Sequence, residues 1–431
     1  MATSVRYMSD AVSYPEESCK LALVGFGTVG SAVARLLHAR RHEHGLQLTH
    51  VFNRSVERKK VEWMSPEVEW TENIDDVIAS DADVVVELVG GIEPAYDWVS
   101  RALESGKSVV TANKQLIAHY GSELMELAQK CGQRLAFGAS VAGGVPVLAG
   151  LQDGLGGDRL FRLSGILNGT CNYILTRIES AGISFAEALR EAQEKGFAEA
   201  DPTDDIDGYD ARAKLVILAR VGLQAAIRPQ QVECESIRRL AHVDFEYAHE
   251  LGCTIRQVSR VEKHSDRLYA SVEPALVKQD SALAAISGSQ NLVVSTGEFG
   301  GDTVFSGFGA GGNPTAVAVV SDLLQIARQR SQAASAMNAE EYEVSGDFES
   351  MQYVRFVVKD KPGIIATLAR VFSEHRINVD AVLQRRGYSK AELPFVITLE
   401  SCPKSRLQQA LNEMSSLEFL VEEPVSMPLL A

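Results

Sequence analysis

Near the start of the chain, a short apolar segment runs directly into a glycine-rich turn. Residues 20–24 (KLALV) have the composition of a buried strand, and Gly25, Gly27 and Gly30 then form G-x-G-x-x-G. In such a unit the first glycine permits a tight turn, the second admits a pyrophosphate, and the third lets helix and strand pack closely. The first helical turn, with Thr28 and Val29, would face the phosphates. The pattern predicts a dinucleotide-binding domain, with a purely structural turn as the alternative.

The end of the next predicted strand bears on the choice of dinucleotide. Residues 46–53 (LQLTHVFN) alternate as a half-buried strand does. A cofactor without a 2′-phosphate usually meets Asp or Glu at this point, where this chain has Asn53 and Arg54, with three more basic residues at 58–60. We therefore expect NADP, with NAD as the alternative if the basic residues only form a solvated helix start.

Two further strands are predicted in the same domain. Residues 83–89 read as a buried strand followed by a helix with Pro94 in its first turn, and the stretch SVVTANKQLIA from residue 108 reads as a second strand and a turn. The second is followed by Asn113 and Lys114, at the edge where ligands bind in parallel sheets. Lys114 is thus placed to reach a carbonyl or a phosphate. A lysine that merely begins a helix is the alternative, which the helix dipole disfavours.

An acidic stretch in the middle of the chain is the strongest candidate for catalysis. Between Gly196 and Leu215 the chain reads GFAEADPTDDIDGYDARAKL, with six carboxylates in twelve residues. Lys214 opens an apolar run, and Asp210 lies four residues earlier, so the two share one helix face. A lysine partly desolvated beside carboxylates can transfer protons or hold a charged substrate. A calcium-like loop or a surface ion pair would also explain the pattern.

Composition excludes several classes of function. The 431 residues carry a net charge of −15, which argues against non-specific nucleic-acid binding. Six cysteines are scattered without metal-ligand spacing, as in a reduced cytoplasmic protein. No apolar run approaches the roughly 20 residues of a membrane span. Residues 1–18 lack the features of a signal peptide and are predicted to be a disordered extension.

Two glycine-rich segments flank the candidate catalytic region. Residues 138–150 and 306–315 each hold many small residues, which implies close backbone approach to a ligand, a cation or a neighbouring strand. The second segment precedes an apolar helix and is predicted either to touch the cofactor or to form a structural turn. Cys171 is rejected as a nucleophile because no histidine lies nearby in sequence. Ser184 and Glu187 form a capping box for a helix that ends before Gly196.

The C-terminal part has a layout of its own. Residues 329–350 are polar and read as a linker. Beyond them strands are predicted at 353–358, 379–385, 394–399 and 419–422, with helices at 364–375 and 404–413. This β-α-β-β-α-β order is that of a ferredoxin-like domain. It carries no catalytic constellation, so we expect a binding or assembly role.

Seven stretches carry a resemblance to a known family, and they occur in the family's order: VGFGTVG, GGIEPA, TANK, ASVAGGVP, GILNGTCNYILT, GFAEADPTDDIDGYDARAK and GAGGNPTAVAVVSDL. The chain resembles homoserine dehydrogenases across about residues 20–425, and its end resembles an ACT domain, a module that often binds amino acids. The implied fold is α/β, with a Rossmann-type parallel sheet, an α+β catalytic and dimerisation domain, and a ferredoxin-like ACT domain. The implied domains are a disordered extension (1–18), an NAD(P)-binding domain (19–145), a catalytic domain (146–328) whose helix 315–328 returns to the Rossmann domain, a linker (329–350) and an ACT domain (351–425).

The resemblance also implies roles for single residues. Glu199 would hold the substrate's ammonium group, with Asp205 and Asp210 shaping the site. Lys214 would exchange the proton at the substrate oxygen, and Lys114 would polarise that oxygen or meet the cofactor. The cofactor-binding residues would be Gly25, Gly27, Thr28, Val29, Gly30, Asn53, Arg54, Lys114, Gly196 and Gly309. Backbone carbonyls of Gly138, Val141, Gly143 and Val145 would form a Na⁺ or K⁺ site. Two residues depart from the family: Gly138 stands where Glu is usual, and Phe308 where proline is more common.

The implied reaction reduces L-aspartate 4-semialdehyde to L-homoserine with NADPH or NADH, in the biosynthesis of threonine, methionine and isoleucine. The resemblance further implies feedback by threonine through the ACT domain, a homodimer or homotetramer, and neither nucleic-acid nor membrane partners. Three rivals stay open: another NAD(P)-dependent dehydrogenase with an ACT module, a semialdehyde dehydrogenase, and an NADP-binding regulator without turnover. Oxidation of homoserine with NADP, followed at 340 nm, separates them.

Overall fold

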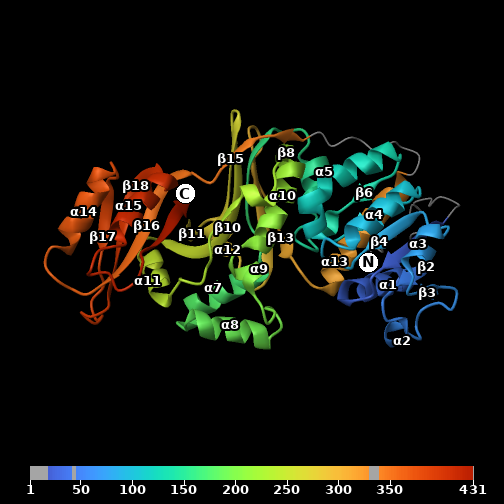
Figure 1. Cartoon of the computed structure of the whole chain (residues 1–431), viewed down its shortest axis with the longest axis horizontal. Coiled ribbons are helices and arrows are strands. Elements are labelled where there is room, and N and C mark those ends of the chain that lie inside the picture. Colours follow the sequence, from blue (N-terminus) through green and yellow to red (C-terminus); the bar gives the residue numbers. More distant parts are fainter. Residues whose placement is uncertain (1–17, 41–44, 330–338, 431) are drawn as a thin grey trace, which may run out of the picture. The chain divides into compact units, whose positions relative to one another are not determined.

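The computed structural model describes residues 18–40, 45–329 and 339–430 (Figure 1). The predicted N-terminal extension therefore lies outside the described residues, apart from Ser18. Contacts divide the chain into two compact units, and each is described by itself. Unit 1 contains residues up to Asn113, Glu123–Phe137 and Ala316–Ala336, and unit 2 contains Lys114–Ser122, Gly138–Thr315 and the chain from Met337 onward.

Unit 1 is built on a six-stranded sheet in which all neighbouring strands run parallel, in the order β3-β2-β1-β4-β5-β6. This is the strand order of a dinucleotide-binding Rossmann fold, so the predicted parallel sheet is confirmed. The central strands are fully buried Val, Leu and Ala runs, as expected where helices cover both faces. Its strands are β1 (Cys19–Val24), β2 (Leu46–Phe52), β3 (Glu69–Thr71), β4 (Val84–Glu87), β5 (Ser108–Thr111) and β6 (Leu135–Ala136).

The helices of unit 1 follow the strands as the sequence pattern predicts. Helix α1 follows the glycine turn, and α4 begins directly after Pro94. Two longer helices, α5 and α13, have residues in both units. The helices are α1 (Thr28–Ala39), α2 (Val56–Lys59), α3 (Ile74–Ala79), α4 (Ala95–Glu104), α5 (Lys114–Lys130) and α13 (Gly312–Arg328).

Unit 2 is built on one large mixed sheet, whose main path runs β13-β12-β7-β10-β11-β19-β16-β18-β17. The first five of these strands belong to the middle of the chain and the last four to its C-terminal segment, so the two parts share one hydrogen-bonded ladder. Strands β9 and β15 pair with β11 beside this path, and β8 pairs with β14. The strands of the middle region are β7 (Leu160–Ile166), β8 (Ala225–Ala226), β9 (Glu233–Cys234), β10 (Cys253–His264), β11 (Arg267–Lys278), β12 (Gln290–Gly297) and β13 (Gly301–Phe308).

The helices of the middle region pack on this sheet and carry the candidate site. Ser184 and Glu187 form the predicted capping box at the start of α8, and Gly196, with φ +73°, follows its end. The elements are η1 (Gly138–Ser140), α6 (Val147–Ala149), η2 (Gly150–Gly154), α7 (Gly169–Ala181), α8 (Phe185–Glu194), α9 (Thr203–Ile206), α10 (Tyr209–Leu223), η3 (Pro229–Gln231), α11 (His242–Glu250) and α12 (Ala282–Ala285).

The C-terminal segment has the predicted β-α-β-β-α-β order, with its strands arranged β19-β16-β18-β17. Its own helices pack on one face of these strands, while α11 packs on the other, where Phe245 and Tyr247 meet Tyr353 and Val396 (Figure 1). The elements are β16 (Glu349–Val358), α14 (Ile364–Glu374), β17 (Val379–Leu383), β18 (Leu393–Pro403), α15 (Lys404–Met414) and β19 (Val425–Leu430).

Two predictions for this region were wrong in detail. The last strand is β19 at 425–430 rather than 419–422, where only one isolated bridge, Val358 to Leu420, forms. Phe419 is buried among the apolar residues of the C-terminal helices, so its hydrophobicity reflects packing in a turn. The predicted linker also contains structure, because β14 (Glu340–Glu341) and β15 (Glu343–Ser345) pair with strands of unit 2 through their backbones. Residues 330–338 of that linker lie outside the described residues.

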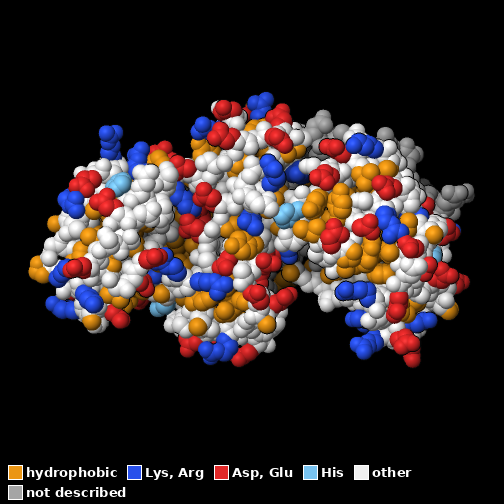
Figure 2. Space-filling view, in the orientation of Figure 1, with side chains coloured by type: hydrophobic (Ala, Val, Ile, Leu, Met, Phe, Trp, Pro, Cys, Tyr) orange, Lys and Arg blue, Asp and Glu red, His pale blue; other side chains and the backbone are white. Residues whose placement is uncertain are grey.

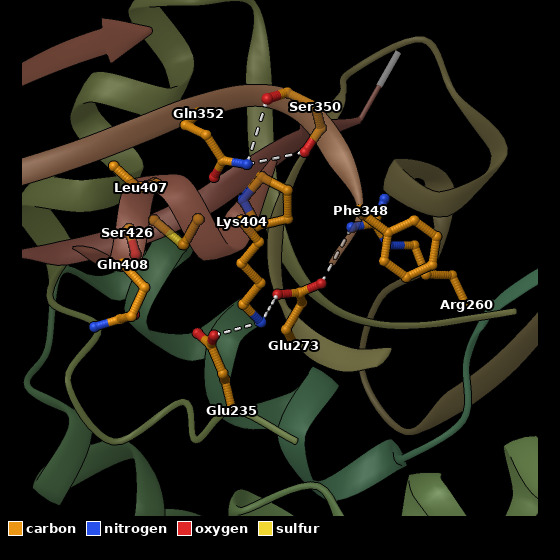
Figure 3. A pocket seen from close by; sticks show the side chains of 12 residues that line it. Glu235, Arg260, Glu273, Phe348, Ser350, Gln352, Lys404, Leu407, Gln408 and Ser426 are labelled. Carbon is orange, nitrogen blue, oxygen red and sulfur yellow. Dashed lines mark hydrogen bonds and ion pairs between the residues drawn. The ribbon is translucent and has the colours of Figure 1, made fainter. Parts of the chain in front are cut away.

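A polar pocket lies where the C-terminal segment meets β10 and β11 (Figure 3). Lys404, the first residue of α15, points its Nζ at Glu273 (2.8 Å) and Glu235 (2.6 Å). Arg260 pairs with the other oxygen of Glu273 at 3.2 Å and lies against the ring of Phe348. The two segments are thus joined by buried charges as well as by strand pairing.

Candidate active site

The acidic stretch folds into a short helix and a long one. Helix α9 ends at Ile206, and α10 begins after Gly208, which has φ +85°. A Cβ at Gly208 would also lie 3.0 Å from the Val272 side chain, so both backbone and space require glycine. Asp210 falls in the first turn of α10, where the helix dipole favours a carboxylate.

Asp210 is the centre of the site. Its Oδ1 lies 2.7 Å from the Nζ of Lys114, and its Oδ2 lies 2.7 Å from the Nζ of Lys214. Lys214 Nζ also donates to the carbonyl oxygen of Leu167 at 2.8 Å. The predicted placement of Asp210 and Lys214 on one helix face is what the structure shows, whereas the pairing of Lys114 with Asp210 was not predicted.

The electrostatics of this cluster favour charged groups. Burial alone would raise the pKa of Asp210, but the charges of Lys214 and Lys114 outweigh it and hold that pKa well below its usual range. Burial would lower the pKa of Lys114, but the charge of Asp210 and its hydrogen bond outweigh burial and raise it. Asp210 is therefore a carboxylate and Lys114 an ammonium at neutral pH.

Asp205 lies beside this cluster. Its Oδ1 accepts a hydrogen bond from Asn168 Nδ2 at 2.6 Å, and the same nitrogen donates to Asp210 Oδ2 at 2.9 Å. Burial raises the pKa of Asp205, and the charge of Asp210 acts in the same direction. The second oxygen of Asp205 receives no hydrogen bond from the described residues and is available to a ligand.

The remaining acidic residues differ in their surroundings. The side chain of Glu199 is exposed, and its carboxylate has no partner among the described residues. Asp207 accepts a hydrogen bond from Ser236 Oγ at 2.6 Å and pairs with Arg238 at 3.0 Å. Asp201 lies in the loop before α9, and its exposed carboxylate accepts a hydrogen bond from the Thr203 backbone N–H.

Cys171 is a buried thiol and not an activated nucleophile. Its Sγ donates to the backbone oxygen of Asp205 at 3.1 Å. Burial, followed by the charges of Asp205 and Asp210, raises its pKa well above the usual value. A thiolate is the reactive form of cysteine, so this environment suppresses nucleophilic chemistry.

The glycine turn of unit 1 has the geometry that a dinucleotide requires. Gly25 has φ +104°, and a Cβ there would lie 2.8 Å from the Leu88 carbonyl oxygen. A Cβ at Gly30 would approach the Gly25 carbonyl closer than 3.0 Å, whereas a Cβ at Gly27 would meet nothing within 4 Å. Gly25 and Gly30 thus close the turn, while Gly27 leaves open space in front of the start of α1. The residues present fit a bound pyrophosphate.

Two further features of unit 1 position its loops. Glu87, at the end of β4, accepts hydrogen bonds from the backbone N–H groups of Val89 and Gly90, and from Thr111 Oγ1 at 2.5 Å. This buried carboxylate fixes the loop after β4 and was not singled out by sequence reasoning. At the end of β2, Asn53 accepts from the Ser55 N–H, and Arg54 is exposed.

The two glycine-rich segments of unit 2 pack against each other. Gly144 N–H donates to the Phe308 carbonyl oxygen at 3.2 Å, and a Cβ at Gly143 would lie 2.6 Å from the Gly309 carbonyl oxygen. At Gly309, a Cβ would overlap the buried amide of Asn291, whose Nδ2 donates to the Leu167 carbonyl oxygen at 2.7 Å. Asn291 and Leu167 are thus site residues that sequence reasoning missed. Packing against Asn291 is sufficient to require glycine at position 309, and the cofactor contact expected of Gly309 stays a prediction.

Comparison with known proteins decides the family. Family models match residues 146–324 ("Homoserine dehydrogenase"), 25–138 ("Homoserine dehydrogenase, NAD binding domain") and 352–419 ("ACT domain"). The homoserine dehydrogenase of Bacillus subtilis is 35% identical over 419 residues, which cover 94% of this chain and 97% of that protein. The chain belongs to the homoserine dehydrogenase family. It is accordingly an NAD(P)-dependent oxidoreductase, and an ACT domain forms its C-terminal segment.

Solved structures agree with this assignment. A homoserine dehydrogenase from Thiobacillus denitrificans superposes with a TM-score of 0.89 at 30% identity, covering 96% of this chain and 98% of that one. A hyperthermophilic archaeal homoserine dehydrogenase in complex with NADPH matches with a TM-score of 0.64 at 28% identity, covering 74% of this chain and 100% of that one.

Side-chain metal clusters and membrane-spanning helices are both absent from the described residues. Among the described residues, no group of three or more His, Cys, Asp or Glu side chains is arranged to hold a metal ion. None of the described helices is both long and apolar enough to cross a membrane. On the face shown in Figure 2, acidic and basic side chains are interspersed.

Proposed function

We propose that this chain interconverts L-aspartate 4-semialdehyde and L-homoserine, with Lys214 exchanging the proton and Lys114 stabilising negative charge on the substrate oxygen. The observation that carries this proposal is the buried Asp210 carboxylate held between the two lysines, 2.7 Å from each. When bound, the nicotinamide cofactor supplies or accepts the hydride at the substrate carbon. Reduction of the aldehyde then needs one proton at oxygen, which a lysine must provide.

The geometry supports different tasks for the two lysines. Lys214 Nζ uses two of its three hydrogens for Asp210 and Leu167, which leaves one hydrogen for a substrate oxygen. Lys114 has a raised pKa and holds its proton strongly, which suits a permanent cation beside a developing oxyanion. Asp210 keeps both lysines in place and offsets their mutual repulsion.

The substrate's ammonium group requires a carboxylate that is not already engaged. The neighbouring cluster already balances its two acids with two bases: it contains Asp205, Asp210, Lys114 and Lys214. Glu199 is exposed and has no partner among the described residues, so we assign the ammonium group to Glu199, with Asp205 as a second contact.

Substitution of Lys214 tests the proposal. General acid catalysis contributes about 10²- to 10⁴-fold, so Lys214→Ala should lower kcat by that order while the Kd for NADPH stays within about twofold. Lys130→Ala, an exposed lysine on α5, is the control and should behave like the wild type. Near-normal kcat for Lys214→Ala, measured at 340 nm with homoserine and NADP, would contradict the assignment. Glu199→Ala should mainly raise KM for homoserine.

NADP is the proposed cofactor. The single amide oxygen of Asn53 already accepts from the Ser55 N–H, whereas a carboxylate offers two charged oxygens to the ribose hydroxyls, and Arg54 is exposed next to it. Three further exposed basic residues, Arg58, Lys59 and Lys60, follow within α2 and its end. We expect Arg54→Ala to raise KM for NADPH at least severalfold and to leave KM for NADH unchanged. An equal effect on both cofactors would argue against a 2′-phosphate contact.

A monovalent cation site at residues 138–145 is also proposed. The Val141 and Gly143 carbonyl oxygens accept no hydrogen bond from the described residues, and the Val145 carbonyl accepts one, from Val147 N–H at 2.7 Å. These oxygens suit Na⁺ or K⁺, and a cation there would hold the turn in place. Thermal unfolding in KCl, NaCl and tetramethylammonium chloride tests this proposal. The apparent Tm should be higher in KCl or NaCl than in tetramethylammonium chloride, whose cation is too large for the site.

Regulation by threonine is proposed for the ACT domain. Its presence at residues 352–419 supports an amino-acid effector. Threonine should lower the rate of homoserine oxidation in a saturable way, whereas serine at the same concentration should have little effect. A rate independent of both amino acids would contradict this part of the proposal.

We further propose a homo-oligomer that pairs through β13. Among the described strands β13 pairs with β12 alone, and it exposes Val304 and Phe308, next to the highly exposed Phe299. An apolar edge strand of this kind is a template for pairing with another chain. Val304→Lys should lower the mass measured by light scattering, whereas Val382→Lys on the opposite edge strand, β17, should not. An unchanged mass for Val304→Lys would exclude this edge.

A further inference from the structure

Asn168 occupies a fixed position at the start of α7. It is the N-cap residue, and its Oδ1 accepts a hydrogen bond from the Cys171 backbone N–H at 2.8 Å. The side chain is buried, with 3% of the residue exposed. Because the oxygen must face the helix N–H, the orientation of the amide is determined, and its Nδ2 points away from the helix.

That nitrogen bridges two carboxylates from different helices. Nδ2 donates to Asp205 Oδ1 on α9 at 2.6 Å and to Asp210 Oδ2 on α10 at 2.9 Å. Two carboxylates this close repel each other and tend to share a proton. An amide nitrogen has two hydrogens and no charge, so one Asn168 side chain satisfies both acids while they stay ionised. Burial excludes water from replacing it freely.

We propose that Asn168 is a positioning residue for the reaction, which holds Asp205 and Asp210 at one fixed separation through its two amide hydrogens. This inference rests on the proposed function, because it assigns Asp205 to the substrate and Asp210 to the two lysines. With Oδ1 of Asp205 held by Asn168, its second oxygen is directed to the ligand. With Oδ2 of Asp210 shared between Asn168 and Lys214, its Oδ1 is left for Lys114.

Two substitutions separate this role from helix capping. Asn168→Asp keeps an acceptor for the Cys171 N–H but replaces both donor hydrogens with a third carboxylate. Asn168→Ser retains a good N-cap residue with a side chain too short to bridge the two acids. Asn172→Ala is the matched control, because Asn172 is equally buried on α7 and its side-chain amide donates to the Gly288 carbonyl oxygen and, among the described residues, to neither carboxylate.

We expect Asn168→Asp and Asn168→Ser to lower kcat/KM for L-homoserine by about 10- to 100-fold, with KM for the cofactor within about twofold. Asn172→Ala should stay within about threefold of the wild type in kcat/KM, whatever its Tm. Lys214→Ala and the wild type are assayed alongside, so that a failure of the proposed function shows independently of the Asn168 variants.

The pH profile gives a readout that a merely structural residue would not change. Asp205 is faced by Asp210 and Lys214 on α10, Lys114 on α5 and the Cys171 thiol on α7. Loss of the Asn168 hydrogen bond removes one of the influences that lower the pKa of Asp205, while burial and Asp210 continue to raise it. The acidic limb of kcat/KM should therefore move to higher pH in Asn168→Ser and stay in place in Asn172→Ala. If both Asn168 variants have the wild-type kcat/KM and the wild-type pH profile, then Asn168 serves only as a helix cap and the proposal is overturned.

Discussion

Gly309 offers a sharp test of how unit 2 is packed around Lys214. In Gly309→Ala the new Cβ would lie less than 3.0 Å from three side-chain atoms of Asn291, a distance that real Cβ contacts essentially never show. The backbone of Gly309 has no positive φ, so alanine is conformationally acceptable and the clash is the only penalty. Asn291 is 2% exposed and has no free space into which to turn.

The size of the effect follows from what Asn291 must give up. Moving its amide breaks the 2.7 Å hydrogen bond to the Leu167 carbonyl oxygen, which contributes about 1 kcal/mol. Overpacking a filled site adds about 1–3 kcal/mol. The sum, about 2–4 kcal/mol, corresponds to a fall in Tm of roughly 4–16 °C at about 2–4 °C per kcal/mol. Because Leu167 also accepts from Lys214, kcat should fall along with stability.

Thermal unfolding and steady-state kinetics of Gly309→Ala, without and with NADPH, measure this effect. Gly157→Ala is the control, since Gly157 is exposed and a Cβ there meets nothing within 4 Å. A wild-type Tm for Gly309→Ala would refute the packing argument. A variant with wild-type Tm and a raised KM for NADPH would instead assign Gly309 to the cofactor.

Three further predictions concern other contacts of unit 2. Burial would raise the pKa of Glu273, but the positive charges of Lys404 and Arg260 outweigh burial and lower that pKa from its usual value. The ionised Glu273 therefore stabilises the fold above the pKa that it has in the unfolded chain, and this stabilisation is lost as the pH falls through its pKa in the folded protein. Glu273→Gln should therefore flatten the decline of Tm on acidification, and an unchanged acid slope would contradict the ion pair. Asp244→Asn, which weakens the fully buried pair with Arg355 (2.8 Å), should lower the free energy of unfolding by about 3–5 kcal/mol in urea denaturation. Ser184→Ala removes the capping box of α8 and should lower it by about 1 kcal/mol, with kcat unaffected.

Local patterns in the sequence were sufficient for several parts of the molecule. The glycine turn, the capping box at Ser184 and the shared helix face of Asp210 and Lys214 each depend on residues only a few positions apart. The parallel sheet of unit 1 was predictable because its strands β1, β4 and β5 are short apolar runs, each followed by a helix.

Contacts between distant segments were not predictable in the same way. Lys114 and Asp210 meet through the fold alone, and no spacing in the sequence connects them. Asn168 carries a visible N-cap signal, but its second role depends on two carboxylates from other helices. Strand β13 was not predicted: its last residues, 306–308, were read as part of a glycine-rich segment, and its partly exposed side chains conceal the strand pattern. Strand β19 was missed because the apolar residue Phe419, which packs in the core from the preceding turn, led to a strand being predicted at 419–422 instead.

Strand β19 has a consequence for how the chain reaches its folded state. It comes last in chain order among the described strands, yet it lies inside the sheet, pairing with β16 along Val425–Leu429 and with β11 at Leu429 and Leu430. During synthesis the two halves of the sheet therefore have exposed edges until residues 425–430 emerge. Pairings between segments so distant in sequence form slowly. Until then one edge of β16 and the end of β11 at Leu276 and Val277 lack their partner strand, and unpaired strand edges of a nascent chain are sites of aggregation.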